Sequence, residues 1–457
     1  MKIIQKQHAM LSAFFKPVAY ISGEELRPLK YLYTTAVPEG LLVFNVLGRD
    51  LILLEDKETE LLKTAVMPDA PGETLHFLLD HRFLVRADFD ERAVCLDLRA
   101  AIRNMEALFT KHLQIATIIT TTDCNARCWY CYEADTKKQT MDSETAGATA
   151  DYLQKYGDPK DMSLVWFGGE PLMNPSAIDI ITSRMRDEGR TFTSKILTNG
   201  YLFDPEIVKR AKNDWNVASV QIPIDGTEQA YNRCKRFIGA DPDESPFKRV
   251  LGNIGLLLDA GIETAVRMNV SAANEPEMVS LVGILRKRFA GRDGFAAYVS
   301  ELHDIPHRLE NSRSSSYFEQ EEKALQHVRQ QIIDAGIKTE RRRSSLSSLP
   351  SIHYCDSISL FAAAIMPDGT LQSCWEFMHY PAWGNVRDFP QKTEKDIKRW
   401  AEEYPELPEC SDCPRFPDCL RPRCCLFTKP QCSGLFRNSC KQEYIEKMIG
   451  AYQSTML

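Results

Sequence analysis

Two kinds of apolar segment are missing from this 457-residue chain. The opening residues, MKIIQKQHAMLSAFFKPVAY, contain no uninterrupted apolar core like that of a signal peptide. No later stretch approaches the roughly 18 consecutive apolar residues that a membrane-spanning helix needs. The chain also contains no internal repeat. We therefore expect a cytoplasmic protein with no membrane partner.

Positive charge is in short supply as well. The chain has 56 Lys and Arg against 63 Asp and Glu, a formal net charge of -7. Nucleic acids and anionic membranes bind basic faces, so this balance argues against either as the main partner. What the chain does have is apolar material: 44% of its residues are hydrophobic, enough for more than one buried core.

The 14 cysteines are too few for the disulfide framework of a secreted scaffold of this length. In a reducing cytoplasm they would be idle unless they bind metal, and most of them are clustered. The sequence therefore favours metal sites.

The first 110 residues predict a small α+β unit. Three short strands, YLYTTA, LLVFNVL and DLILL, are separated by the turn signals PEG and GRD, and helical patterns follow at 55–65 and 73–83. We predict a separate N-terminal unit over residues 1–110.

Residues 111–305 change to apolar strands that alternate with amphipathic helices. Helices are expected near 142–156, 175–187, 204–213, 246–259 and 275–289, and the strands are LQIATIITT, SLVWFGG, SKILTNG, ASVQIPIDG, ETAVRMNV and GFAAYVSEL. Six β/α units in series predict an α/β fold with a parallel sheet, curled into a partial (β/α)6 barrel. In such a sheet the chemistry gathers at the carboxyl ends of the strands.

The remaining chain divides into a connector and a tail. Residues 306–350 are polar and contain a charged helix near 316–335, whereas residues 351–457 are Pro-rich and cysteine-rich. Such a tail cannot build much apolar core, so metal would have to stabilise it.

Three thiols, Cys124, Cys128 and Cys131, follow the first strand of the series in the stretch TTTDCNARCWYCYEAD. A structural zinc site wants four ligands, and no histidine lies nearby to complete the set. A disulfide would leave one thiol over. A 4Fe-4S cluster held by three thiolates keeps one iron free to bind something else.

This motif, with Tyr130 before its third cysteine and at the end of the first β/α strand, resembles that of the radical S-adenosylmethionine (SAM) enzymes. The resemblance implies that SAM chelates the free iron and that one electron from the cluster cleaves it to a 5'-deoxyadenosyl radical. It implies SAM and a 4Fe-4S cluster as cofactors.

The later strand ends agree with this resemblance. Gly168 and Gly169 in FGGEPL let the backbone approach a ligand, and Glu170 resembles the residue that accepts SAM's amine in the family. Asn199 in LTNG and Asp225 in IDG are suited to ribose hydroxyls, although both stretches are also ordinary turns.

The fifth strand adds a basic residue. Arg267, which shares a strand face with Asn269, resembles the arginine that pairs with SAM's carboxylate, and the alternative is a plain salt bridge. Pro223 replaces a serine that relatives carry two residues before Asp-Gly, and this removes one expected SAM contact.

The tail resembles a SPASM domain, which implies two auxiliary 4Fe-4S clusters and three clusters in all. By position, the first auxiliary cluster would use Cys355, Cys374 and Cys424, and the second Cys410, Cys413, Cys419 and Cys440. One spacing departs from the family, since four residues rather than three separate Cys419 from Cys424. Cys425 or Cys432 could close the first cluster, or its iron could stay open for a substrate thiolate. A zinc ribbon that includes Cys410 and Cys413 is the alternative.

These resemblances imply a radical SAM oxidoreductase that matures a ribosomally made precursor peptide (RiPP) by thioether, carbon-carbon or oxidative chemistry. The N-terminal unit resembles a winged-helix-like element that captures a leader peptide as an added strand, and it could equally be a cap. A flavodoxin or ferredoxin is the expected electron donor, and no catalytic side chain can be named.

Two alternatives stay open. The first alternative is a side-chain oxidase of the anaerobic sulfatase-maturating type. Such enzymes carry an aspartate directly after the cysteine that corresponds to Cys374, whereas this chain has Trp375 and then Glu376. A non-catalytic iron-sulfur electron carrier or leader-binding adaptor would explain the cysteines but not Glu170, Asn199 and Arg267 at successive strand ends.

Overall fold

The structure is a computed structural model of all 457 residues. It describes the chain except for residues 7–10, 12–13, 16, 303–314, 340–345, 347–355, 376–381, 397–409, 411, 420–433 and 456–457, and except for the side chains of 103, 106, 107, 109, 315–319, 358 and 434–440. The chain forms two compact units, which are described separately. The first comprises 1–109, 342–354 and 401–457, and the second 110–341 and 355–400.

The second unit contains a large sheet whose order, within the described residues, is β12-β11-β10-β9-β8-β7-β13-β14-β15. Its strands β7 to β12 are parallel to their neighbours and occur in chain order. They are β7 (Ile115–Thr121), β8 (Met162–Gly168), β9 (Phe192–Leu197), β10 (Val217–Pro223), β11 (Glu263–Val270) and β12 (Phe295–Glu301). The predicted α/β parallel sheet is therefore confirmed, and the closure into a partial barrel stays a prediction.

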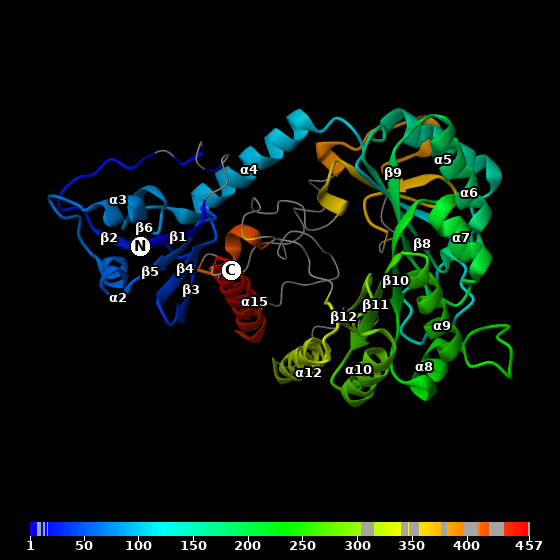
Figure 1. Ribbon diagram of the computed structural model, residues 1–457. Helices are drawn as coiled ribbons and strands as arrows, with labels where there is room; N and C mark the ends of the chain where they lie inside the picture. Colours follow the sequence, from blue (N-terminus) through cyan, green and yellow to red (C-terminus); the bar gives the residue numbers. More distant parts are fainter. Residues whose placement is uncertain are drawn as a thin grey trace. The chain divides into compact units, whose positions relative to one another are not determined.

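Helices follow each of these strands. They are α5 (Ser143–Tyr156), α6 (Pro175–Asp187), α7 (Pro205–Asn213), α8 (Glu228–Lys235), α9 (Pro246–Asp259), α10 (Glu275–Phe289) and α12 (Ser315–Asp334). Figure 1 shows α5, α6, α7 and α9 along one face of the sheet. Local sequence explains where they begin, because Asp142 and Asp204 cap the first turns of α5 and α7 through their side chains. Proline then stands at the start of α6, α7 and α9, where its missing N–H costs nothing.

Two features of the second unit differ from expectation. Helix α8 was not predicted, because its sequence EQAYNRCK is short and mostly polar. Strands β13 (Ala362–Ile365), β14 (Thr370–Gln372) and β15 (Gly384–Asn385) extend the sheet beyond β7, although the tail was expected to contribute little core. Strand β13 lies parallel to β7 and is buried throughout. Its four small apolar residues form a strand because they can pair with the edge strand β7 and join a core that already exists.

The first unit contains a small antiparallel sheet of order β1-β5-β4-β3 among the described residues. These strands are β1 (Lys2–Gln5), β3 (Leu32–Val37), β4 (Gly40–Asn45) and β5 (Leu51–Leu54), and a second pair joins β2 (Leu26–Pro28) to β6 (Leu84–Arg86). Helices α2 (Asp56–Thr59), α3 (Glu73–Asp80) and α4 (Glu91–Phe109) accompany them, with a 3-10 turn at Glu60–Lys63. The three strands and two helical stretches expected from the sequence are present, and the winged-helix resemblance stays a prediction.

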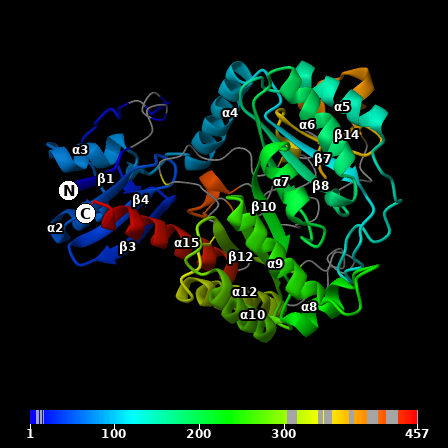
Figure 2. The same cartoon turned by 45° about the vertical axis from the view of Figure 1, so that its right-hand side comes forward.

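The end of the chain shares the core of this first unit. Helix α15 (Gly434–Gln453) lies beside β3 and β4 (Figure 2), and the ring of Tyr444 stacks on Tyr33 at 4.5 Å and on Phe44 at 5.8 Å between centroids. Residues 355–400 belong to the second unit and 401–457 to the first, and the single tail domain over 351–457 stays a prediction. No helix in the described part of the chain is long and apolar enough to cross a membrane.

Candidate cofactor site and cysteine loops

The loop that carries Cys124, Cys128 and Cys131 begins where β7 ends, and we call residues 122–134 the first cysteine loop. All three thiols are half-buried. The N–H of Cys124 donates to Asp123 Oδ1 at 2.8 Å, and the N–H of Cys131 donates to the carbonyl of Cys128 at 3.2 Å. The loop therefore leaves the carboxyl end of the first parallel strand, as the sequence predicted.

The surroundings of Cys124 suit a sulfur that accepts hydrogen bonds. Its Sγ accepts from the N–H of Ala126 at 3.4 Å and lies 3.9 Å from Asn199 Nδ2. Burial, with the charge of Glu170, raises the pKa of Cys124 to about 12, and burial also raises the pKa of Cys131. Among the described residues no three His, Cys, Asp or Glu side chains are gathered closely enough to hold a metal ion. The donor set and its N–H partners nevertheless fit a cluster that takes three thiolates from one loop.

Gly168 and Gly169 bring the end of β8 against the first cysteine loop. The N–H of Gly169 donates to the carbonyl of Thr121 at 3.0 Å, and the N–H of Glu170 donates to that of Asp123 at 2.9 Å. A Cβ on Gly168, which has a φ of +131°, would lie 2.1 Å from the carbonyl oxygen of Thr121, and a Cβ on Gly169 would lie 2.2 Å from that of Asp123. The two glycines are thus required where the backbone meets the cysteine loop, and not only for the predicted approach of a ligand.

Glu170 is fully buried directly after these glycines. Its Oε1 accepts from Thr198 Oγ1 at 2.7 Å and from the N–H of Leu172 at 3.1 Å, and its Oε2 accepts from the N–H of Asn199 at 2.8 Å. Burial raises the pKa of Glu170 to about 7, although these hydrogen bonds and the charge of Lys235 oppose the shift. The carboxylate therefore joins the ends of β8 and β9, and Oε2 keeps acceptor capacity for a further donor.

Asn199, after β9, contacts the first cysteine loop directly. Its Nδ2 donates to Asn125 Oδ1 at 2.7 Å, and its Oδ1 accepts from the N–H of Tyr201 at 3.0 Å. Asn199, which the sequence predicts to bind a ribose hydroxyl, thus holds the side chain of Asn125, the residue next to Cys124.

Asp225, after β10, is the centre of a buried polar network. Its Oδ2 accepts from Tyr130 Oη at 2.6 Å and pairs with Lys235 Nζ at 2.7 Å, and its Oδ1 accepts from Asn269 Nδ2 at 2.7 Å. Burial alone would lower the pKa of Lys235, but the charge of Asp225 and the nearby Tyr130 raise that pKa well above its usual value. Tyr130 and Asp225, both predicted to bind cofactor, are thus brought together with one residue that the sequence analysis missed, Lys235.

Arg267 lies on β11 with Pro223 of β10 as its register partner. Its guanidinium donates to Ser300 Oγ at 3.0 Å, and its buried Nε has no hydrogen-bond partner. A half-buried guanidinium with an unused donor suits the carboxylate that the resemblance assigns to it. Pro223 thus lies directly beside this arginine on the neighbouring strand.

The second cysteine loop, residues 410–419, belongs to the first unit. Cys410, Cys413 and Cys419 are half-buried in it, and the N–H of Cys413 donates to the carbonyl of Cys410 at 3.3 Å. Cys440 lies on α15, four positions before Tyr444, and its side chain is outside the described set. Of the ligands predicted for the first auxiliary cluster, only Cys374 is described. Cys355 and Cys424 lie outside the described residues, as do Cys425, Cys432 and Glu376.

Two buried arginines, one in the turn between β4 and β5 and one on α4, hold the second cysteine loop. Arg49 donates to both oxygens of Asp418, at 2.7 Å from Nη1 to Oδ2, and Tyr444 also bonds that carboxylate. Arg99, on α4, donates to the carbonyls of Phe416, Pro417 and Cys419, the last at 2.8 Å. The second cysteine loop is therefore part of the core of the first unit. The sequence had predicted residues 1–110 as a unit of their own, without this loop.

Replacing Arg49 by methionine is expected to destabilise the first unit strongly, because it removes the charged partner of the buried Asp418 carboxylate and leaves Tyr444 as its hydrogen-bond donor. Loss of one partner of a buried pair costs about 3–5 kcal/mol. The matched control is Lys30→Met, because the ion pair of Lys30 with Asp412 is exposed, and such pairs contribute about 0–1 kcal/mol. Denaturant unfolding measures both, and equal stability losses in the two variants would contradict the inference.

Near Cys374, the ring of Trp375 packs on Phe167 with 4.6 Å between centroids. Ile119, Ala364 and Met366 complete this small apolar cluster. The residue directly after Cys374 is therefore a packing residue.

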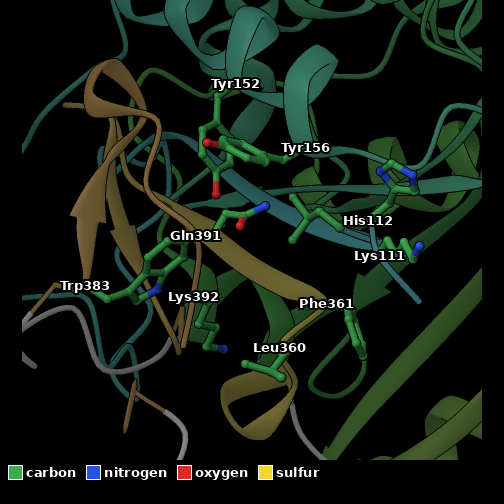
Figure 3. Close-up of a pocket in the computed structure, with 10 residues that line it drawn as sticks. Lys111, His112, Tyr152, Tyr156, Leu360, Phe361, Trp383, Gln391 and Lys392 are labelled. Carbon is green, nitrogen blue, oxygen red and sulfur yellow. The ribbon is translucent and has the colours of Figure 1, made fainter. Parts of the chain in front are cut away.

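A pocket of about 160 Å³ lies at the other end of the sheet (Figure 3), beside the residues that precede β7 and β13. It is lined by Lys111, His112, Leu113, Tyr152, Tyr156, Leu360, Phe361, Trp383, Gln391 and Lys392. Because the cysteine loop leaves the carboxyl end of β7, this pocket is separate from the candidate cofactor site.

Comparison with known proteins agrees with the site. Residues 118–278 match the model of the radical SAM superfamily. The chain is 25% identical over 153 residues to radical SAM cyclopropyl synthase TigE of Paramaledivibacter caminithermalis, covering 29% of this chain and 30% of that protein. It is 26% identical over 159 residues to an AdoMet-dependent heme synthase of Methanosarcina barkeri, covering 35% of this chain and 43% of that protein. The matches thus span less than half the length of these relatives.

Solved structures share the fold. The structure of native anSMEcpe with bound AdoMet superposes with a TM-score of 0.56 at 18% identity, covering 75% of this chain and 100% of that one. SuiB of Streptococcus suis bound to precursor peptide SuiA gives a TM-score of 0.51 at 11% identity, covering 88% and 96%.

Proposed function

We propose that this protein is a radical SAM enzyme that reductively cleaves SAM and modifies a residue of a precursor peptide. The observation that carries the proposal is the convergence on one cysteine loop of the ends of β8, β9 and β10. Glu170, Asn199 and Asp225 each lie at one of those strand ends and are each linked to the loop or its neighbours by hydrogen bonds. An iron-sulfur electron carrier would need the thiols but not these three polar side chains.

The cysteines and polar side chains predicted from the sequence would hold the cofactors. Cys124, Cys128 and Cys131 would hold a 4Fe-4S cluster through three thiolates, and Arg267 and Glu170 would receive the carboxylate and amine of SAM. When bound, the cluster and SAM would together supply a one-electron cleavage of SAM to methionine and a 5'-deoxyadenosyl radical, which takes a hydrogen atom from the substrate. Residues Cys374, Cys410, Cys413, Cys419 and Cys440, with Cys355 and Cys424, would hold two auxiliary clusters.

A peptide substrate is supported by two features. The folds of anSMEcpe and SuiB, whose structures include complexes with the Cp18Cys peptide and with SuiA respectively, extend over most of this chain. In the first unit, β3 ends the small sheet, and a sheet edge can add a peptide strand. We propose that a leader peptide binds to the N-terminal unit and that a flavodoxin or ferredoxin supplies the electron.

The test is anaerobic reconstitution with iron and sulfide, followed by reduction in the presence of SAM and peptides encoded beside the gene. Formation of 5'-deoxyadenosine together with a peptide that has lost two hydrogen atoms and carries a cross-link but no aldehyde supports a cross-linking maturase. An aldehyde on the peptide would instead identify the side-chain oxidase. If the protein binds its full complement of iron and sulfide and still forms no 5'-deoxyadenosine, the proposal is wrong.

Glu170→Gln is expected to weaken SAM binding by about tenfold or more, because a charge-assisted hydrogen bond contributes about 1.5–3 kcal/mol. The amide also places an N–H against one of the donors that Glu170 now accepts from, Leu172 or Asn199. Equilibrium SAM binding measures the effect, with iron content as a check on folding. Glu188→Gln, on an exposed position after α6, is the control. An unaltered dissociation constant in Glu170→Gln would return this residue to a structural role.

A further inference from the structure

Lys235 is a buried cation without an assigned role. It ends α8 and is only 1% exposed. Its Nζ lies 2.7 Å from Asp225 Oδ2 and 2.7 Å from Tyr130 Oη, while Tyr130 Oη lies 2.6 Å from the same carboxylate oxygen. The three groups therefore form a closed triangle between α8, the end of β10 and the first cysteine loop.

The backbone around Lys235 also contacts that loop. The carbonyl of Lys235 accepts from the N–H of Arg127 at 2.8 Å, and the N–H of Ile238 donates to the carbonyl of Asn125 at 2.7 Å. Arg236, held in a left-handed conformation with a φ of +46°, donates from Nε to the carbonyl of Arg127 at 2.9 Å. We call residues 235–238 the α8 anchor.

The anchor bonds the loop on both sides of its middle cysteine. Asn125 and Arg127 precede Cys128, and Tyr130 follows it. Backbone bonds join the anchor to the segment before Cys128, whereas Lys235 reaches the segment after Cys128 through its side chain, in the triangle with Asp225 and Tyr130. Lys235 is thus a side chain of α8 that contacts the segment between Cys128 and Cys131.

A simple core ion pair would not need this arrangement. Burying a lysine costs free energy, and apolar residues of similar volume commonly serve as well where only packing is required. Here the ammonium group has two partners that both belong to the candidate cofactor site, and the tyrosine lies between two of the three proposed ligands. The centre of the Tyr231 ring lies 5.8 Å from the ammonium group, within the range of a cation–π contact.

We propose that Lys235 is a positioning residue of the cofactor site, which holds Tyr130 and Asp225 together and so preorganises the first cysteine loop for its cluster and for SAM. The expected effect on SAM binding rests on the proposed function. The expected effect on the mobility of the loop rests on the fold alone.

The test compares Lys235→Met with Lys235→Arg and with Lys248→Met. Lys248 is a suitable control because it lies on the next helix, α9, in an exposed ion pair with Glu228. Hydrogen–deuterium exchange of residues 124–131 in the iron-free chain measures how firmly the loop is held. Electron paramagnetic resonance (EPR) of the reduced, reconstituted protein, with and without SAM, reports the cluster.

We expect exchange of this segment to be about tenfold faster or more in Lys235→Met, because the buried carboxylate of Asp225 loses its only charged partner in the triangle and Tyr130 loses one of its two hydrogen bonds. The same variant should weaken SAM binding and alter the spectral response to SAM. Lys235→Arg should recover part of both effects because it keeps the charge and the donors, and Lys248→Met should match wild type.

A milder variant guards against misfolding of Lys235→Met. Tyr130→Phe keeps the Lys235–Asp225 pair and removes only the hydroxyl, so it should speed loop exchange with little change in thermal stability. Wild-type exchange in both Lys235→Met and Tyr130→Phe would overturn the proposal. Failure of Lys235→Arg to recover anything would do the same, because packing volume and not charge would then be the requirement. If the wild-type protein does not cleave SAM, the proposed function fails, while the exchange measurement still decides the role of Lys235.

Discussion

Replacing Cys124, Cys128 and Cys131 together with alanine is expected to abolish the formation of 5'-deoxyadenosine from SAM in the reduced, reconstituted protein. These three half-buried thiols share one loop at the end of β7, and Cys124 already receives the N–H of Ala126. Without them no group in that loop can hold the cluster through sulfur, so the expected effect is complete loss and not a reduced rate.

The matched control makes the same three changes in the other loop, at Cys410, Cys413 and Cys419. That variant should also lose iron, yet it should still cleave SAM, because these residues lie in the first unit and the radical SAM match covers 118–278. Iron content, 5'-deoxyadenosine and the EPR spectrum are measured for both proteins. Undiminished cleavage in the variant of the first loop would end the radical SAM proposal for this site.

Gly169→Ala is expected to abolish cluster and SAM binding although it alters no polar side chain. The added Cβ would lie 2.2 Å from the carbonyl oxygen of Asp123 and 2.9 Å from that of Thr122, so the end of β8 must separate from the cysteine loop. Overpacking costs about 1–3 kcal/mol, occasionally more, and each backbone hydrogen bond lost adds about 1 kcal/mol. The two bonds at risk run from Gly169 to Thr121 and from Glu170 to Asp123.

Gly252→Ala provides the control for this substitution. Gly252 lies within α9 with open space around its Cα, so alanine there should stabilise the helix by about 0.5–1 kcal/mol. Thermal unfolding, iron content and equilibrium SAM binding distinguish the two variants. Normal iron content and SAM affinity in Gly169→Ala would show that the close approach is not required.

The sequence predicted the parallel sheet because its signal is local. Apolar strands bounded by glycine and proline alternate with helices whose first turns carry Asp142, Asp204 or proline, so strand and helix bounds follow from neighbouring residues. The segments that escaped prediction lack such a signal. Helix α8 is short and polar, and β13 is four small apolar residues that become a strand only because the edge of β7 accepts them.

The candidate site divides in the same way. The spacing of Cys124, Cys128 and Cys131 and the side chains at successive strand ends could be identified from the sequence, since parallel strands present their carboxyl ends at one edge. Their partners could not. Glu170 bonds to Thr198 and to the N–H of Asn199, 28 and 29 positions away, and Arg49 bonds to Asp418, 369 positions away.

Residue types and local spacing thus determined the α/β class, the cysteine motif and the likeness to radical SAM enzymes. Only the tertiary structure decided that Lys235 completes the network of Tyr130 and Asp225, that Gly168 and Gly169 meet the cysteine loop, and that the second cysteine loop belongs to the N-terminal core. The physical reason is that sequence patterns report which face of an element is apolar, whereas the partner of a buried charge is fixed by which distant segments pack together. A buried lysine or arginine is stable only where that packing brings a carboxylate within hydrogen-bond distance, and no local pattern specifies where this occurs.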